Sequence, residues 1–464
     1  MPLAQYAAGL LASTLARVSG ELLAELAEWI AIPSVSADPA CAADVERAGD
    51  WLVAKIRAAG GEAERIDWQG QPLVLGEIAA SGGREAPTVL CYGHFDVQAV
   101  DPLELWESEP FSLVERDGWL YGRGSADDKG QLLMLLEAAR SLARENALPV
   151  NVRFACDGEE EVGGSSIADF LAADERGADA CLIFDTSMIE RDVPAFTIAT
   201  RGLAYFHLEL ASGERDLHSG VFGGAALNAL HALTETLAAV LPAGGHLPEP
   251  LMAGVVPPSA EELAAISALP VGERVLAEQG ARPADERAAT ELYLRTCAWP
   301  ALDVNGIEGG SPRLQKTVLP VHAEANLSIR LAPGQDADVI ASALERLLRE
   351  AAPAGAELRM QLLSSSAPGL VDQNAPAIQL ALAAFERSFG RRPLLVRSGG
   401  TMPIVPALQA KGIAAIVTGF DLPEGNIHSP NERLWAGYVE PGIAAAKAIL
   451  TELGTRLKTK HSAA

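Results

Sequence analysis

Short apolar runs alternate with helical patterns over about the first 195 residues of the chain. The apolar runs are four to six residues long, for example at 152–155 and 181–184, which is the pattern of strands buried on both faces. Amphipathic segments with helical periodicity lie between them, notably at 44–59 and 131–145. This alternation predicts an α/β domain in which helices cover both faces of a mostly parallel sheet.

The pattern changes between about residues 197 and 366. Strand and helix patterns then follow one another around a Pro- and Ala-rich stretch, at 204–210 (strand), 225–240 (helix), 323–331 (strand), 337–351 (helix) and 357–363 (strand). This order is typical of a small α+β domain of the split βαβ, ferredoxin-like type. A helix at 375–389 and a strand before Gly419 return to the first pattern. We therefore predict one domain in two parts, 1–196 and 367–464, with a second domain inserted at 197–366; the mixed stretch 247–296 has no role that its pattern indicates.

Side chains that can bind a metal follow several of the apolar runs. Five separate loops, four of them just beyond an apolar run, carry His94, Asp127, Glu161, Asp185 and His428. In open α/β sheets, ligand sites form at the carboxyl ends of the strands, so we expect these side chains to meet. Two imidazoles and three carboxylates suit a pair of divalent ions such as zinc that share one carboxylate.

Two of these loops carry further signals. Asp96 follows His94 by two residues, so its carboxylate can hold one ring nitrogen and fix the tautomer while the other nitrogen binds metal. Asp127 ends a Gly-rich turn that leads directly into a helical pattern, which is a rigid place for an anionic ligand. Both loops therefore favour a metal site over ordinary polar residues.

Composition narrows the class of protein. A formal net charge of −25 opposes binding to nucleic acid or to an anionic membrane face. The length of 464 residues exceeds what one hydrophobic core usually holds, and the five scattered cysteines are expected to be reduced. The N-terminus lacks a basic n-region, and charges interrupt the helical pattern at 10–32, which argues against a signal peptide and a membrane span. We predict a cytoplasmic protein without nucleic-acid or membrane partners.

Six motifs together resemble the co-catalytic zinc exopeptidase family, which includes carnosine-type dipeptidases, glutamate-releasing carboxypeptidases, aminoacylases and the acetylornithine and succinyl-diaminopimelate deacylases. The resemblance extends from about residue 25 to about residue 450. It is closest to the dipeptidase branch, through the fifth motif and through Asn-Gly-Ile-Glu-Gly-Gly at 305–310. In chain order, the motifs are Gly-His-Phe-Asp-Val at 93–97, Gly-Arg-Gly-Ser-Ala-Asp-Asp-Lys-Gly at 122–130, Glu-Glu-Glu-Val-Gly at 159–163, Phe-Asp-Thr at 184–186, Asp-Leu-His-Ser-Gly-Val-Phe-Gly-Gly at 216–224 and Asn-Ile-His-Ser-Pro-Asn-Glu at 426–432.

The resemblance implies a catalytic domain that binds two divalent metal ions, with zinc expected and manganese or cobalt as alternatives. His94 and Asp185 would hold one ion, Glu161 and His428 would hold the other, and Asp127 would bridge them. The inserted domain would be a lid and dimerisation domain. The family also implies that the peptide bond between Asp127 and Asp128 is cis.

The resemblance makes Glu160 the general base that takes a proton from the metal-bridging water. Adjacent side chains at a strand end point in different directions, so Glu161 can bind metal while Glu160 stays free. We assign no role to Glu159, which we expect to be a solvated loop residue, and we expect Asp128 to shape its turn.

Substrate residues are expected in the inserted domain and beyond it. The resemblance implies that His218 reaches the site of the partner subunit in a homodimer and polarises the scissile carbonyl. Arg330, accompanied by Thr317, could clamp a substrate carboxylate, although a salt bridge within its own domain is an alternative. After Ser398, a backbone nest with a hydroxyl suits the terminal carboxylate of the substrate, at Gly399, Gly400 and Thr401.

One departure from the family concerns the end of the inserted domain. Many dipeptidase relatives have a histidine there, whereas this chain has Ser364, Ser365 and Ser366, so the usual imidazole contact to substrate is missing. Three functions stay open: cleavage of dipeptides or short peptides, deacylation of N-acyl amino acids, and the role of a metal-containing binding protein without catalytic activity. The last is disfavoured because every ligand position and Glu160 are present.

Overall fold

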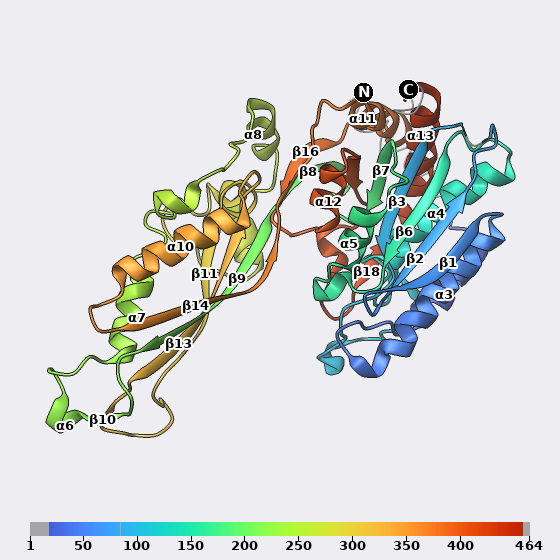
Figure 1. Cartoon of the computed structure of the whole chain (residues 1–464). Coiled ribbons are helices and arrows are strands. Elements are labelled where there is room, and N and C mark those ends of the chain that lie inside the picture. The colour runs from blue at the N-terminus through green and yellow to red at the C-terminus, as the bar shows by residue number, and fades with distance from the viewer. Residues whose placement is uncertain (1–17, 84, 458–464) are drawn as a thin grey trace. The chain divides into compact units, whose positions relative to one another are not determined.

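A long central sheet accounts for the apolar runs in the first part of the sequence (Figure 1). The computed structural model describes residues 18–83 and 85–457, and the chain divides into two compact units. The first unit contains the chain up to Thr197, Val371–Leu395 and the chain from Ala407 on. Its strands lie in the order β1 (Glu62–Trp68), β2 (Gln71–Ile78), β6 (Asn151–Asp157), β3 (Thr88–His94), β7 (Ala180–Phe184), β17 (Ala414–Thr418) and β8 (Ala195–Thr200), and the chain of β8 continues past Thr197 into the second unit.

The four middle strands of this sheet, β6, β3, β7 and β17, run parallel. Strands β2 and β8 flank them in antiparallel pairings. All five residues of β7 are buried, as expected for a strand covered on both faces. The predicted mostly parallel sheet is confirmed at its centre, and the antiparallel strands lie to either side of it.

Helices pack against this sheet where the sequence pattern placed them. α3 (Ala42–Ala58) buries Val45, Leu52 and Ile56 at helical spacing and packs on β1 and β2. The other described α-helices that lie wholly in this unit are α2 (Gly20–Ile30), α4 (Lys129–Arg144), α5 (Ser166–Ala173), α11 (Pro376–Phe389) and α13 (Val439–Arg456), and α12 (Ile404–Ala410) ends in it. The helical pattern expected at 10–32 is described from residue 18 on, so its first residues lie outside the described chain.

The second unit contains Ile198–Leu370 and Val396–Pro406. Its elements follow one another as β9 (Gly202–Ala211), α7 (Ala229–Ala238), β11 (Ala301–Glu308), β13 (His322–Leu331), α10 (Ala337–Ala351) and β14 (Glu357–Ser366). The four strands form an antiparallel sheet in the order β11-β13-β9-β14. This βαββαβ order is the predicted ferredoxin-like arrangement. The segment Val396–Pro406, which the sequence pattern assigned to the other domain, belongs to this unit.

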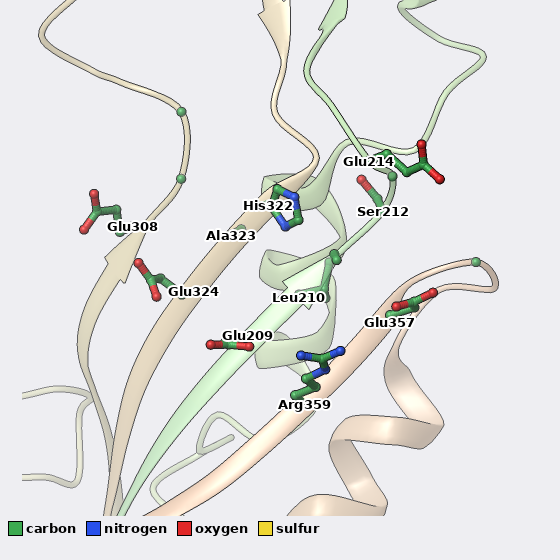
Figure 2. Close-up of a pocket in the computed structure, with 15 residues that line it drawn as sticks. Glu209, Leu210, Ser212, Glu214, Glu308, His322, Ala323, Glu324, Glu357 and Arg359 are labelled. Atoms are coloured by element: carbon green, nitrogen blue, oxygen red, sulfur yellow. The ribbon is translucent and has the colours of Figure 1, made fainter.

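The two faces of the second unit's sheet differ in polarity. Ala204, Phe206 and Leu208 alternate along β9 and are buried in a core with residues of α7 and α10. Polar side chains of the strands line a cavity of about 710 Å³, among them Glu209, Glu324 and Arg359 (Figure 2). None of the site residues predicted from the sequence lines this cavity.

The mixed stretch 247–296 folds into short elements of the second unit. They are a 3-10 helix at Glu249–Met252, α8 (Ala260–Ile266), α9 (Gly272–Glu278) and a π-helix at Leu294–Ala298. Cys91, Cys156 and Cys181 are buried, and all five cysteines are free, as predicted. Among the described residues, no helix combines the length and apolar character that crossing a bilayer requires.

Candidate metal centre

The parallel strands bring the predicted ligands to one edge of the sheet. β3 ends on His94, which lies opposite Asp157, the last residue of β6. β7 ends immediately before Asp185, and the main-chain N–H of Asp185 donates to the carbonyl of Thr418 at the end of β17. Because these strands run parallel, the loops that carry the ligands start side by side.

Asp127 lies at the centre of the group, in the loop between β5 (Trp119–Tyr121) and α4. Its Oδ1 lies 2.9 Å from Nε2 of His94, and its Oδ2 lies 2.9 Å from Nε2 of His428. Nε2 of His428 is 3.0 Å from Oε2 of Glu161, and Nε2 of His94 is 3.8 Å from Oδ1 of Asp185. The structure therefore brings all five predicted ligands together, with each oxygen of Asp127 facing a different imidazole.

The donor set fits divalent metal ions. Ligand atoms of His94, Asp127 and Glu161 lie within 4.8 Å of one another, and so do those of His94, Asp128 and Asp185. Nitrogen and oxygen donors without a thiolate suit Zn²⁺, Mn²⁺ and Co²⁺. Converging carboxylates repel one another in a buried site, and bound cations offset that repulsion.

Asp128 does more than shape its turn. The peptide bond between Asp127 and Asp128 is cis, as predicted. Oδ2 of Asp128 accepts the main-chain N–H of His94 at 3.2 Å. The neighbouring Gly93 allows this approach, because a Cβ there would lie 2.5 Å from that oxygen. Asp128 therefore fixes the end of β3, and its carboxylate stands among the groups that could bind metal.

Asp96 orients both His94 and the turn that carries the glutamates. Nδ1 of His94 lies 3.1 Å from the main-chain oxygen of Asp96 and 3.4 Å from its carboxylate. The same carboxylate accepts the main-chain N–H groups of Glu160 at 3.2 Å and of Glu161 at 3.1 Å. The predicted contact to the imidazole is thus made mainly by the backbone, and the carboxylate holds the glutamate turn.

The charges of these residues perturb one another strongly. Burial raises the pKa of Glu160 to about 9, against the opposing effect of His94. Hydrogen bonds to Asp127 and Glu161 raise the pKa of His428 to about 10. Burial works against ionisation of Asp127, but its hydrogen bonds to His428 and His94 hold its pKa well below the usual range. Strongly shifted pKa values are concentrated at functional sites, so they support a functional role for this cluster.

The predicted substrate residues form two groups in the second unit. In one, Nη1 of Arg330 donates to Oγ1 of Thr401 at 3.0 Å. In the other, His218 on β10 (Leu217–His218) is exposed, and the following Ser219 donates its N–H to the carbonyl of Thr317 at 3.0 Å. Among the described residues, no carboxylate lies within 4 Å of Arg330, so the structure does not support the alternative of a salt bridge within its domain.

Comparison with known proteins decides the family. Residues 90–452 match the family described as Peptidase family M20/M25/M40. The chain belongs to this family. It is 29% identical to the human Beta-Ala-His dipeptidase over 452 residues, which cover 90% of this chain and 88% of the relative. It is 28% identical to the Cys-Gly metallodipeptidase dug1 of Schizosaccharomyces pombe, with 89% of this chain and 91% of the relative covered.

The solved structures agree with this assignment. An M20 family metallo-carboxypeptidase from Sulfolobus solfataricus superposes with a TM-score of 0.81 at 25% identity and covers 94% of this chain and all of its own. M20 metallopeptidases use metal ions, and the chain is a metallopeptidase. The α/β sheet with an additional smaller domain is the fold of these relatives.

Sequence reasoning missed the residue that holds the loop of Asp127 in this M20 metallopeptidase. Oε1 of Glu432 accepts the main-chain N–H groups of Gly124, Ala126 and Asp127 at 2.9–3.1 Å. Its Oε2 is 2.6 Å from Nη1 of Arg123, and both side chains are fully buried. The last motif contained Glu432, and the charged pair of Glu432 and Arg433 directly before the apolar Leu434 was the available signal.

The expectation that Glu159 is a solvated loop residue is wrong. Its side chain is buried, and its Oε1 accepts the main-chain N–H of Ser166 at 2.9 Å. Ser166 is the first residue of α5, so Glu159 caps that helix and complements its dipole. The three consecutive glutamates therefore have three different environments.

Proposed function

We propose that this protein is a dipeptidase that hydrolyses the amide bond of dipeptides or short peptides. It would use two divalent metal ions, and zinc is the expected metal. The observation that carries the proposal is the position of Asp127, whose two oxygens face His94 and His428 separately. A carboxylate between two ligand groups is what a pair of ions about 3.5–4 Å apart requires. Two relatives that match over about 90% of the chain are named as dipeptidases.

The ligands divide into two sets around Asp127. His94 and Asp185 would hold one ion, and Glu161 and His428 the other. When bound, the ions polarise the scissile carbonyl and lower the pKa of a water molecule toward about 7.

Glu160 is the proposed general base. Among the described residues, none donates a hydrogen bond to its carboxylate. Bound cations would oppose the effect of burial on its pKa, so that the ionised carboxylate could accept a proton from the attacking water. Its main-chain N–H is held by Asp96, which keeps the carboxylate in place. After the attack, Glu160 returns the proton to the leaving amino group.

The second unit supplies the proposed contacts to the substrate. Arg330 and Thr401 already share a hydrogen bond, and together with Gly399 and Gly400 they would bind the terminal carboxylate of a dipeptide. Thr317 lies beside the segment of His218 and would accompany these contacts.

His218 would polarise the scissile carbonyl in the partner subunit of a homodimer. Its ring is exposed, and the neighbouring Val221 and Phe222 expose 68% and 44% of their surfaces. Exposed apolar side chains of this size are typical of surfaces that another protein chain covers. This supports a dimer in which the segment around His218 meets a second copy.

Activity assays test the proposed function. The metal-depleted protein is reconstituted with Zn²⁺, Mn²⁺ or Co²⁺ and assayed on a panel of dipeptides beside N-acetyl and N-succinyl amino acids. We expect hydrolysis of the dipeptides, loss of turnover in chelator and recovery on addition of metal. Turnover of the acylated amino acids alone would replace the proposal by a deacylase, and full activity after dialysis against chelator would overturn the role of the metal.

A further inference from the structure

Arg201 is a buried arginine to which the sequence assigned no role. Only 9% of its surface is exposed. Its Nε donates to the carbonyl of Gly399 at 3.0 Å, and its main-chain N–H donates to the carbonyl of Gly400 at 3.0 Å. Its Nη1 lies 3.4 Å from the carbonyl oxygen of Arg295. Three main-chain carbonyls are therefore turned toward one residue.

The charge of Arg201 has no acidic partner. Within residues 18–83 and 85–457, no carboxylate oxygen lies within 4 Å of the guanidinium of Arg201, and the same holds for Arg330. Burial lowers the pKa of Arg201 to about 10; Cys297 and Asp303 oppose this lowering and the charge of Arg330 adds to it, and Arg201 remains cationic at neutral pH. A buried cation without an anion is costly, which indicates that an anion binds here.

The hydrogen bonds of Arg201 set the direction of the loop after Ser398. Since the C=O and the following N–H of a peptide unit point in opposite directions, the N–H groups of Gly400 and Thr401 point away from Arg201. The N–H of Gly400 bonds to Oγ of Ser398 at 3.1 Å. Among the described residues, the N–H of Thr401 has no partner, and the hydroxyl of Thr401 accepts from Arg330. The loop thus presents a donor next to a cation.

Residues of the stretch 247–296 pack against the same loop and the strand before it. A Cβ on Gly399 would lie 2.6 Å from the carbonyl oxygen of Thr296 in the π-helix, so the loop packs directly on that helix. Nε of Arg397 is 2.6 Å from Oε1 of Glu262, and both side chains are buried. Arg397 also donates to the carbonyl of Val256 at 2.8 Å. This gives the stretch a function: it fixes the strand and loop from Arg397 to Thr401.

We propose that Arg201 is a positioning residue that holds the 398–401 loop in the conformation that receives the carboxylate of the substrate, and that its charge makes this site selective for substrates with a free terminal carboxylate. The proposal rests on the proposed function, in which Arg330 and Thr401 contact that carboxylate. Arg201 acts through the loop and through its charge.

The test compares a dipeptide that the enzyme hydrolyses with the C-terminal amide of the same dipeptide. Arg201→Met should raise KM for the free dipeptide at least about tenfold, the usual effect of losing a charged hydrogen bond, with a much smaller change in kcat. KM for the amide should stay near that of the wild type, and Arg201→Lys should recover part of the loss. Arg359→Met, at an exposed arginine of the same unit, is the matched control.

A second readout does not depend on turnover. Hydrogen exchange at the amide of Gly400, which bonds to Oγ of Ser398, should accelerate at least about tenfold in Arg201→Lys and not in the control, because the loop loses its fixed conformation. If Arg201→Met does not fold, Arg201→Lys decides by both readouts. The proposal is overturned if the variants leave two quantities unchanged: the ratio of the KM values for the free and the amidated dipeptide, and the rate of hydrogen exchange in the loop.

Arg330→Met separates the two levels of inference. Suppose that Arg330→Met loses the preference for the free dipeptide, whereas Arg201→Met and Arg201→Lys retain it. The proposed role of Arg201 is then wrong, and the proposed carboxylate site is still supported. If neither variant changes the preference, the carboxylate site itself must be abandoned.

Discussion

The two units build their sites with opposite charges. In the first unit, buried carboxylates hold the loops by accepting main-chain N–H groups, as Glu432, Asp96 and Asp128 do. In the second unit, buried guanidinium groups hold the loop by donating to main-chain carbonyls, as Arg201 and Arg397 do. The first arrangement leaves excess negative charge and the second leaves excess positive charge.

This difference in charge indicates which class of ligand each unit binds. A cluster of carboxylates and imidazoles binds cations, and a loop beside two unpaired guanidinium groups binds an anion. The residues that orient the site are thus also residues that select its ligands.

The largest expected effect distinguishes the proposed general base from a proposed metal ligand in the first unit. Glu160→Gln should lower kcat by about 10³–10⁴ with metal content unchanged, because it removes proton transfer and no proposed ligand. Asp127→Asn should lose metal as well as activity, because both imidazoles face that carboxylate. Metal analysis of the two purified variants is the measurement. Equal metal content in both would show that the separation of base from ligand is wrong.

The next effect tests whether the second unit acts across a dimer. His218→Ala should lower kcat by about a hundredfold, which is typical for loss of one group that polarises a carbonyl. Mixing this variant with Glu160→Gln under conditions of subunit exchange should restore about a quarter of the wild-type activity, because half of the dimers are mixed and each has one intact site. A mixture as inactive as its parents, with exchange demonstrated, would place the action of His218 within its own subunit or remove it.

A smaller effect concerns the carboxylate that holds the loop of Asp127. Glu432→Gln should weaken metal binding about 10–100-fold and lower stability, because Arg123 then keeps a buried charge without a partner. Adding Arg123→Met should recover part of the thermal stability without recovering metal affinity. Metal titration and thermal melting of the single and double variants check this. Equal metal affinity in wild type and Glu432→Gln would show that the loop does not need this contact.

The smallest effect is a pH dependence in the second unit. Burial opposes ionisation of Glu262, but the hydrogen bond from Arg397 lowers its pKa below the ordinary value of 4.5. The depressed pKa adds stability above about pH 4.5, which is lost as the pH falls through the lowered pKa. Wild type should therefore lose more thermal stability below pH 4.5 than Glu262→Gln does, by about 2–4 °C. Parallel melting curves across that range would contradict this.

Local patterns in the sequence determined most of the elements. The periodicity at 337–351 predicted α10 with its observed bounds, and the run at 152–155 lies within β6. Hydrophobic periodicity depends on neighbours a few positions apart, so it can be recognised without the fold. The positions of His94, Asp185 and His428 beyond apolar runs followed in the same way, because parallel strands present their carboxyl ends together.

Only the tertiary structure decided which polar residues hold these loops. Glu432 meets Arg123 across 309 positions of sequence, and Arg201 meets Gly399 across 198. Glu159 is buried because α5 begins beside it, and Val396–Pro406 belongs to the second unit because it packs there. A buried charge needs a partner, but the partner can come from any segment that the fold brings near, and a linear pattern does not specify that segment.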